Sequence, residues 1–358
     1  MPTAANVEHY AGIVLEKSLL RSLIAAGTEM VSLGYDEGEE VEALLDRAER
    51  AVFAIGQRRR RQEPQSIREI LRQSFEKIDR RYQHKGAVTG LATGFTDLDL
   101  MTSGLQPGDM IIVAARPSMG KTTWCTNAAL HAALVEALPV AIFSLETSRE
   151  QLVHRILCAE ARVDTARLRT GLLADEDWRR LARAMGALSE APIFIDDSPT
   201  LSVMEMRAKA RKLKAEHGLA LVVVDYIQML QSVGRAENRT QELSEIARGL
   251  KSLAKELNVP LVAISQLSRA VETLGSRRPM LSHLRESGEL EAVADVVLFL
   301  YREDYYDAER AEREGKRDAC EVIVAKHRNG PVGTIELYFE KACGRFANLE
   351  RRRRAEDV

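Results

Sequence analysis

Gly120, Lys121 and Thr122 follow an apolar run at the spacing that a phosphate-binding loop requires. The apolar run, residues 110–115, predicts a buried strand, and the pattern becomes helical after Lys121. Backbone N–H groups at the start of a helix face anions, and the helix dipole favours negative charge there. A lysine at this position reaches the β- and γ-phosphates of a nucleotide, and the Thr122 hydroxyl can bind Mg²⁺. The predicted nucleotide-contacting residues of the loop are Ser118, Met119, Gly120, Lys121, Thr122 and Thr123.

The match to the general loop pattern is imperfect at its first position. Ala115 stands where the pattern G-x-x-x-x-G-K-[ST] has a glycine. An ordinary strand, turn and helix with a chance Gly-Lys-Thr is therefore the alternative interpretation of this segment. Other parts of the chain have to decide between the two.

Three polar side chains end other apolar runs, and these are Glu146, Asp225 and Gln266. Parallel sheets bind ligands at the carboxyl ends of their strands, so the three are candidates for the same site. Asp225 would hold Mg²⁺ through water, and Glu146 is suited to polarise the attacking water as a general base. Gln266 could sense the γ-phosphate through a hydrogen bond. The structural alternatives are a charge at a helix N-terminus for Glu146 and a strand cap for Gln266.

Lys326 and Arg328 are the candidates for completing the charge around the transferred phosphate. Phosphoryl transfer gains on the order of 10³–10⁵ in rate from an arginine that contacts the developing charge. No other cation clearly supplies this contact within the subunit. Alternate positions at the end of a strand project both side chains to one side. A solvated hairpin end is the alternative interpretation of the pair.

Two segments that combine glycine with polar and charged residues are candidates for nucleic-acid contacts, because their backbone N–H groups can bind phosphates. These segments are residues 234–239 and residues 284–288. Mobile surface loops are the alternative interpretation of both. The candidate DNA-binding residues are Arg235, Asn238, Arg285, Glu286 and Gly288.

The composition describes a globular chain of 358 residues, which is long enough for one large domain and a smaller one. With 51 basic and 53 acidic residues, the net charge of -2 excludes a surface that is basic throughout. Nucleic-acid contacts must therefore be local or shared among subunits. The four cysteines stand in apolar stretches without a C-x-x-C pair, as expected in a reducing compartment. No secretory segment or apolar run of transmembrane length is present, so we expect a cytoplasmic protein with no membrane partner.

Strands and helices alternate after Gly94, which predicts an α/β fold with a mostly parallel sheet covered on both faces. The expected strands are 110–115, 139–145, 192–195, 219–224, 259–265, 295–300, 320–325 and 334–339. The expected helices between them are 122–137, 149–161, 175–188, 203–216 and 241–257. This region, residues 94–350, forms the predicted nucleotide-binding domain, and residues 351–358 form a solvated tail.

The N-terminal part of the chain has a different organisation. Helical spacing over residues 4–30 and a second helix that begins at Asp36 predict a helical hairpin within residues 1–56. Residues 57–93 have the composition of a linker, and within them Ser66 caps an amphipathic helix. Docking of this helix on its own domain and docking on an adjacent subunit are equally consistent with the pattern.

Taken together, these segments resemble the bacterial DnaB family of hexameric replicative DNA helicases, and the similarity extends from Asn6 to Asn348. The motifs that carry it are ARPSMGKT (115–122), FSLE (143–146), VVVDYIQ (222–228), GRAENRTQELSEIARGLK (234–251), ISQLSR (264–269), LRESG (284–288) and AKHRNGP (325–331). Alanine is common in this family at the position of Ala115, which favours the phosphate-loop interpretation.

The resemblance implies a RecA-like P-loop ATPase domain, preceded by an α-helical hairpin and a linker helix, with ATP and Mg²⁺ as cofactors. It implies that Lys121 and Thr122 are the Walker A residues and that Asp225 is the Walker B carboxylate. It also implies that Glu146 is the catalytic base, and Gln266 matches the family's sensor glutamine.

The same resemblance implies that Lys326 and Arg328 reach the γ-phosphate bound by a neighbouring subunit. Arg285, Glu286 and Gly288 match the loop that tracks single-stranded DNA. The linker helix would dock on the next subunit of a homo-hexamer, which decides the choice that the pattern leaves open. Translocation would run 5′→3′ at fork DNA, with primase and a helicase loader as partners. A RecA-like ATPase with a recombination or other DNA-remodelling role, and a non-hydrolysing interaction module, are the competing hypotheses.

Two features depart from the family's pattern. His283 stands where the family usually has aspartate before the LRESG segment, so we expect the local DNA contact to differ in detail. The family's N-terminal region is also longer, and only its helical hairpin and linker are expected in this sequence.

Overall fold

The computed structural model describes residues 7–35, 88–231, 238–267 and 278–349, together with scattered residues between 44 and 75. The chain divides into two compact units, Met1–Gln83 and His84–Val358, and each is considered by itself. Some sequence predictions lie outside the described residues. These are Arg235, the tail 351–358 and most of the second helix of the predicted hairpin.

The first unit contains α1, a helix over Val7–Gly34 that ends at the glycine where the helical pattern stops. In the predicted linker helix, Ile67, Leu71 and Phe75 are helical. Their side chains are 74%, 60% and 72% exposed, and a spacing of four residues places them on one face. Within the described part of the chain, this face therefore forms an uncovered apolar stripe.

The second unit is built on a sheet of nine strands in the order β3-β2-β4-β5-β1-β6-β7-β8-β9. Neighbouring strands are parallel from β3 through β6, and antiparallel from β6 to β9. The α/β fold with a mostly parallel sheet is confirmed. The strands are β1 Met110–Ala115, β2 Val140–Ser144, β3 Ile193–Asp196, β4 Leu221–Asp225, β5 Leu261–Gln266, β6 Val296–Tyr301, β7 Ala319–His327, β8 Gly333–Glu340 and β9 Arg345–Asn348.

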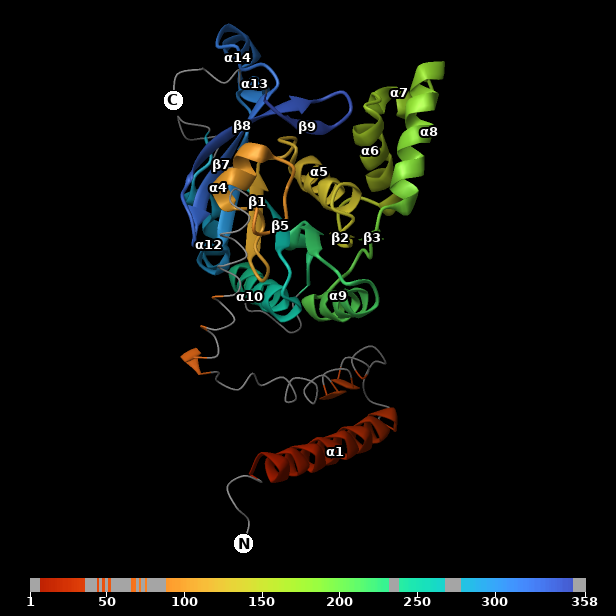
Figure 1. The fold of residues 1–358 in the computed structure, drawn as a ribbon, viewed down its shortest axis with the longest axis vertical. Coiled ribbons are helices and arrows are strands. Elements are labelled where there is room, and N and C mark those ends of the chain that lie inside the picture. Colours follow the sequence, from red (N-terminus) through yellow and green to blue (C-terminus); the bar gives the residue numbers. More distant parts are fainter. Residues whose placement is uncertain are drawn as a thin grey trace. The chain divides into compact units, whose positions relative to one another are not determined.

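Helices cover the sheet and connect its parallel strands. Figure 1 shows α6, α7 and α8 grouped on one side of this unit, with β7 and β8 on the other. The α-helices are α4 Thr96–Thr102, α5 Lys121–Leu134, α6 Arg149–Ala161, α7 Thr165–Thr170, α8 Asp175–Glu190, α9 Val203–His217, α10 Arg239–Leu257, α12 Gly288–Val293, α13 Glu303–Tyr306 and α14 Ala308–Arg313. The 3₁₀ helices are η2 Ile227–Met229 and η3 Leu281–Ser287.

Both faces of the central strands are buried, because successive residues of a strand point to opposite sides. Ile111 on β1 belongs to a buried cluster with Trp124 of α5. Its neighbour Ile112 belongs to a second cluster with Leu250 of α10. The continuous apolar run of β1 therefore reflects a strand between two helical layers, which holds the loop after β1 at a fixed place.

The long elements follow their sequence signals more closely than the short ones. Helix α6 has the bounds that the sequence predicts, and the Ser148 hydroxyl caps it by accepting from the Gln151 N–H at 3.4 Å. Short elements such as α7, α12 and β9 were not predicted, because a few residues do not establish a hydrophobic period.

Part of the predicted linker is built into the second unit. Leu91 pairs with Leu105 in an isolated antiparallel bridge. The Thr93 hydroxyl donates to the buried Asp99 carboxylate at 2.8 Å, and the Thr93 N–H donates to the same group. The segment that leads into β1 is therefore fixed from Leu91 onward. Of the helices described, none is both long and apolar enough to cross a membrane.

Candidate nucleotide site and nucleic-acid loops

Four neighbouring strands end at one cavity. In the sheet order β2-β4-β5-β1, these ends lead to Glu146, Asp225, Gln266 and the phosphate loop. The register aligns them, because Ser144 pairs with Asp225 and Ala115 pairs with Gln266. The cavity has a volume of about 410 Å³. It is lined by Pro117, Ser118, Gly120, Lys121, Thr122, Thr123, Glu146, Thr147, Arg155, Asp225, Tyr226, Ile264, Gln266 and Phe339.

The phosphate loop turns sharply between β1 and α5. Gly120 has a φ of 95°, in the left-handed region that favours glycine, and a Cβ there would lie 2.9 Å from the Phe346 ring. Ser118 adopts a φ of 65°. Met119 does not line the cavity, and it is only 1% exposed, so its side chain belongs to the core. Conformation and packing both require a glycine directly before Lys121.

Lys121 contacts the carbonyl oxygens of its own loop. Its Nζ donates to Ala115 O at 3.0 Å and to Arg116 O at 3.1 Å. Burial lowers the pKa of Lys121 to about 8, although the negative charges of Asp225 and Glu146 act in the opposite direction. The ammonium group is thus poorly solvated, and anionic oxygens would be better partners for it than carbonyl oxygens.

Thr122 and Asp225 form the second polar contact of the cavity. The Thr122 hydroxyl donates to Asp225 Oδ2 at 2.7 Å, and Asp225 is only 3% exposed. Burial raises the pKa of Asp225, while the bond from Thr122 partly offsets this effect. A hydroxyl oxygen and a carboxylate oxygen are ligands that Mg²⁺ prefers, so this pair fits the predicted metal site.

Glu146 and Gln266 line the same cavity, and both are exposed. Glu146 precedes the Ser148 cap of α6, and the acidic residue in the first turn of that helix is Glu150. Both roles predicted for Glu146, general base and helix-terminal charge, stay predictions. At the end of β5, the Gln228 side chain bonds the main chain of Gln266, so that strand end is capped by another residue.

Arg155 is a cation of the cavity that the sequence analysis missed. It belongs to α6 and lines the cavity with Glu146, and its charge acts to lower the pKa of Asp225 against the dominant effect of burial. Arg155 is therefore a further cation at the cavity, and the expectation that no cation of the same subunit contacts the developing charge stays a prediction. Arg155 stands nine positions after Glu146, and only the packing of α6 brings it back to the strand ends.

Lys326 and Arg328 do not line the cavity of their own subunit. Lys326 Nζ donates to the carbonyl oxygens of Glu291 and Ala292, near the C-terminal end of α12. Arg328 also donates to Ala292 O, and its Nε lies 3.7 Å from Asp295 Oδ1. These contacts favour a fixed position over a solvated hairpin end.

The predicted DNA-binding residues that the structure describes lie next to the starts of two α-helices, α10 and α12. Asn238 caps α10, and its Oδ1 accepts from the Gln241 N–H at 2.9 Å. Arg285 and Glu286 belong to η3, and Gly288 begins α12; the side chains of residues 285–287 lie outside the described part.

His283 has a structural position in η3. Its side chain is 7% exposed, and Nδ1 accepts from the Met280 N–H at 2.9 Å. The imidazole therefore caps the turn that leads to the predicted DNA loop. Because His283 is buried, it would affect a DNA contact through the shape of the turn. The expectation that the DNA contact here differs from the family's stays a prediction.

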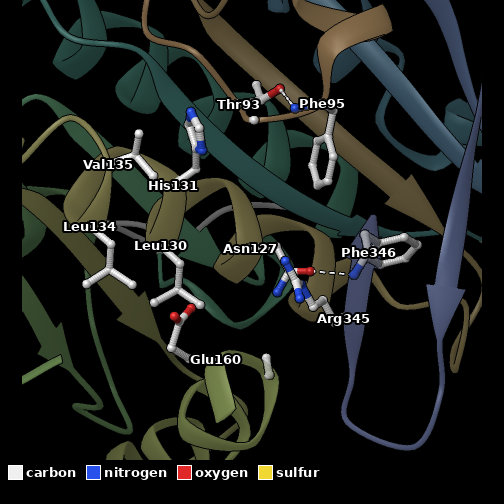
Figure 2. A pocket seen from close by; sticks show the side chains of 12 residues that line it. Thr93, Phe95, Asn127, Leu130, His131, Leu134, Val135, Glu160, Arg345 and Phe346 are labelled. Carbon is white, nitrogen blue, oxygen red and sulfur yellow. Dashed lines mark hydrogen bonds between the residues drawn. The ribbon is translucent and has the colours of Figure 1, made fainter. Parts of the chain in front are cut away.

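A second cavity, of about 290 Å³, lies between α5 and β9. Figure 2 shows Asn127 and Phe346 on its wall, where the Phe346 N–H donates to Asn127 Oδ1 at 2.6 Å. This bond fixes β9 against α5, so the Phe346 ring stays beside Gly120. The second cavity is thus bordered by contacts that support the phosphate loop from outside the nucleotide cavity.

Comparisons with known proteins point to one group. A family model described as the DnaB-like helicase C terminal domain matches residues 90–348. The replicative DNA helicase DnaC of Bacillus subtilis is 51% identical over 353 residues, which cover 98% of this chain and 77% of that protein. The replicative DNA helicase DnaB of Geobacillus stearothermophilus has the same identity and coverage. The DnaB of Haemophilus influenzae is 44% identical, with 99% and 77% of the two chains covered.

Solved structures show the same similarity. One solved ATPase domain superposes with a TM-score of 0.76 at 40% identity, covering 80% of this chain and 100% of that domain. A DnaB-like replicative helicase, studied with its interactions with primase, superposes with a TM-score of 0.81 at 34% identity. That match covers 98% of this chain and 81% of the other.

Proposed function

This chain belongs to the DnaB-like helicase family, and we propose that six copies of it form a ring that moves 5′→3′ on single-stranded DNA. It is a replicative, ATP-dependent DNA helicase, as the family match and the two relatives at 51% identity show. The observation that carries the assignment of its site is the convergence of four neighbouring strand ends on one cavity.

In the proposed reaction, Lys121 binds the phosphates of ATP. Its two bonds to the Ala115 and Arg116 carbonyl oxygens would be exchanged for bonds to the β- and γ-phosphates. The exchange is favourable because a buried ammonium gains charged acceptors in place of neutral ones. Gly120 leaves the space beside Phe346 that allows the loop backbone to turn around the phosphates.

Thr122 and Asp225 would hold Mg²⁺, with Asp225 acting through water. Their two oxygens are 2.7 Å apart in a buried setting, and burial already disfavours the Asp225 anion without a cation nearby. When bound, the metal ion neutralises negative charge on the phosphates. The protein's part is to present the hydroxyl and the carboxylate side by side at the end of β4.

Glu146 acts as the general base in this proposal. It accepts a proton from the attacking water, whose oxygen forms a bond to the γ-phosphorus. The bond between that phosphorus and the bridging oxygen breaks, and ADP leaves with its electron pair. Arg155 shares the cavity with Glu146 and supplies positive charge that acts on Asp225.

Lys326 and Arg328 would complete a neighbouring subunit's site. They are supported in this role by their absence from the lining of their own cavity and by their common anchoring at the end of α12. Single-stranded DNA would contact Asn238, Arg285, Glu286 and Gly288 in the channel of the ring. The uncovered stripe of Ile67, Leu71 and Phe75 supports docking of the linker helix on the next subunit.

The partners of this ring belong to the same proposal. One structural relative was studied with its interactions with primase, which makes primase a candidate partner of this chain as well. Fork DNA and a helicase loader complete the expected set, and the proposed site of action is the cytoplasm.

Unwinding of a forked duplex tests the proposed polarity. The wild-type protein with ATP and Mg²⁺ should displace the strand only when a 5′ single-stranded tail is present. Glu146→Gln should bind ATP but lose turnover by roughly 10²–10⁴-fold, because a general base is lost while the phosphate contacts remain. Displacement from a 3′ tail would contradict the polarity, and homology-dependent pairing without unwinding would favour the recombination hypothesis.

A further inference from the structure

Gln228 closes the VVVDYIQ segment and has no role in the reaction described above. It lies in η2, three residues after Asp225, and its side chain reaches the end of β5. Its Nε2 donates to the buried Ser265 Oγ at 2.9 Å and to Gln266 O at 3.3 Å. Its Oε1 accepts from the Gln266 N–H at 3.4 Å. The side chain of Gln228 therefore contacts both main-chain polar groups of the sensor residue.

This contact requires a donor and an acceptor on one side chain, which the Gln228 amide provides. Only a group with both a donor and an acceptor can bond the N–H and the C=O of Gln266 together. The pair of bonds fixes the main chain of Gln266 where its exposed side chain enters the nucleotide cavity. Gln228 thus fixes the main-chain position from which the Gln266 side chain extends.

The main chain of Gln228 contacts the start of α10. Arg239, the first residue of that helix, donates from Nη2 to the main-chain oxygen of Gln228. Arg239 is held in place by an ion pair with Glu242, with Nη1 and Oε2 2.5 Å apart. Asn238, the predicted DNA contact, is its direct neighbour. One residue therefore connects the sensor at the end of β5 with the helix start at the predicted DNA loop.

We propose that Gln228 is a positioning residue that couples the predicted DNA contact at the start of α10 to Gln266 in the nucleotide cavity. A shift of Arg239 on DNA binding moves η2, and the Gln228 amide carries this shift to the Gln266 main chain. The inference rests on the proposed function, because it assumes that Asn238 contacts DNA and that Gln266 senses the γ-phosphate. Its consequence is that DNA stimulation of ATP hydrolysis depends on Gln228.

The test compares ATP turnover with and without a single-stranded oligonucleotide. Gln228→Met keeps the approximate length of the side chain and removes both bonding groups, so stimulation by DNA should fall to about one-fold. The Michaelis constant for ATP should change by no more than about threefold, because the phosphate contacts are intact. Gln228→Glu retains an acceptor but not the donor, and it should also lose stimulation. Gln231→Ala, at an exposed glutamine three residues later, is the matched control and should keep the wild-type ratio.

A second variant tests whether the two contacts act in series. Arg239→Ala removes the bond to the Gln228 carbonyl and should also abolish stimulation. The double variant with Gln228→Met should then lose no more than either single variant, because one path has already been interrupted. If the double variant instead loses stimulation by the product of the two single-variant losses, the two contacts do not act in series. An unchanged ratio in Gln228→Met, with the wild-type melting temperature, would overturn the proposal itself.

The failure of this proposal is distinguishable from the failure of the proposed function. If the wild-type protein shows no stimulation by DNA and no strand displacement, then the DNA role is wrong and the coupling is refuted with it. If the wild-type protein is stimulated and Gln228→Met is stimulated equally, only the role of Gln228 is wrong. Equal loss of basal and stimulated turnover in Gln228→Met would indicate a purely structural residue and would also contradict the coupling.

Discussion

At the scale of single residues, the chemistry of the nucleotide cavity depends on charges that are poorly solvated before any ligand binds. Burial shifts the pKa values of Lys121 and Asp225 in the directions that weaken their charged forms. Each would regain a strong partner from Mg²⁺-bound ATP, the lysine from phosphate oxygens and the carboxylate from the cation. The cavity is thus arranged so that the ligand supplies the missing counter-charges.

The lowered pKa of Lys121 predicts a pH dependence of nucleotide binding. Above about pH 8 the free protein holds this lysine mostly unprotonated, so binding of the phosphates must be accompanied by uptake of a proton. Affinity for a non-hydrolysable ATP analogue should therefore fall as the pH rises above about 8, by up to about tenfold per unit. Below that pH the affinity should be nearly constant.

Calorimetric titrations in buffers of different ionisation enthalpy measure this proton uptake directly. Uptake should be near zero at about pH 7 and should approach one proton at about pH 9.5. Lys121→Met should bind more weakly at all pH values and lack the slope, because the titrating group is gone. A wild-type affinity that stays flat over this range would show that Lys121 does not titrate there.

At the scale of elements, short segments next to the sheet orient the predicted DNA contacts. The turn η3 is capped by His283, whose Nδ1 accepts from the Met280 N–H at 2.9 Å. Helix α12 follows directly, and its C-terminal carbonyl oxygens hold Lys326 and Arg328. The predicted DNA loop and the predicted finger residues are therefore attached to opposite ends of one short helix.

The cap of η3 gives a prediction for His283. Replacement by alanine leaves the Met280 N–H without this acceptor, which should destabilise the turn by about 1 kcal/mol and weaken binding of single-stranded DNA. His283→Asp should preserve the bond, because a carboxylate oxygen also accepts at a cap. Hydrogen exchange of the amides in residues 280–288 measures the order of the turn. Equal protection in the alanine variant and the wild-type protein would refute the capping role.

In the whole molecule, the described part of one chain holds the proposed nucleotide cavity, and the predicted finger residues lie elsewhere. Lys326 and Arg328 contact the end of α12, while Arg155 and Lys121 are the basic side chains that line the cavity. The proposed ring would bring one subunit's finger residues to the next subunit's nucleotide.

Mixed rings test this sharing of sites. Arg328→Ala should bind nucleotide almost normally and lose turnover, by a factor on the order of 10³ or more. Mixing it with Lys121→Ala protein should restore part of the activity, because some interfaces then combine an intact phosphate loop with an intact finger. ATP turnover measured across a series of mixing ratios reports this effect. No restoration at any ratio would contradict a finger that acts between subunits.

The exposed stripe of the linker helix gives a prediction about assembly. Leu71→Asp combined with Phe75→Asp places two charges on this apolar face, so docking should be lost and the ring should dissociate into smaller species. Native mass spectrometry measures the change. Leu71→Ile combined with Phe75→Leu keeps the face apolar and serves as the control, which should retain the wild-type mass. An unchanged mass in the charged variant would show that the helix does not hold the ring together.

The amino-acid sequence alone was enough to predict the α/β architecture of the second unit and the residue types at its strand ends. Apolar runs that lead to Lys121, Glu146, Asp225 and Gln266 predicted both the parallel sheet and the cavity. This was possible because the hydrophobic period of a strand or helix can be recognised within a short stretch of sequence. The roles of these four residues in the reaction stay predictions.

The distant residues that join these strand ends became visible only in the folded chain. Arg155 reaches the cavity because α6 packs against α5, the helix that follows the phosphate loop, and His283 is buried where η3 packs against α10. Gln228 bonds Gln266 because β4 and β5 are neighbours in the sheet although 38 positions separate the two residues. Such contacts depend on the packing of whole elements, and hydrophobic period in a single segment carries no information about them. The phosphate loop was visible in the sequence, whereas the contacts that position the residues around it were not.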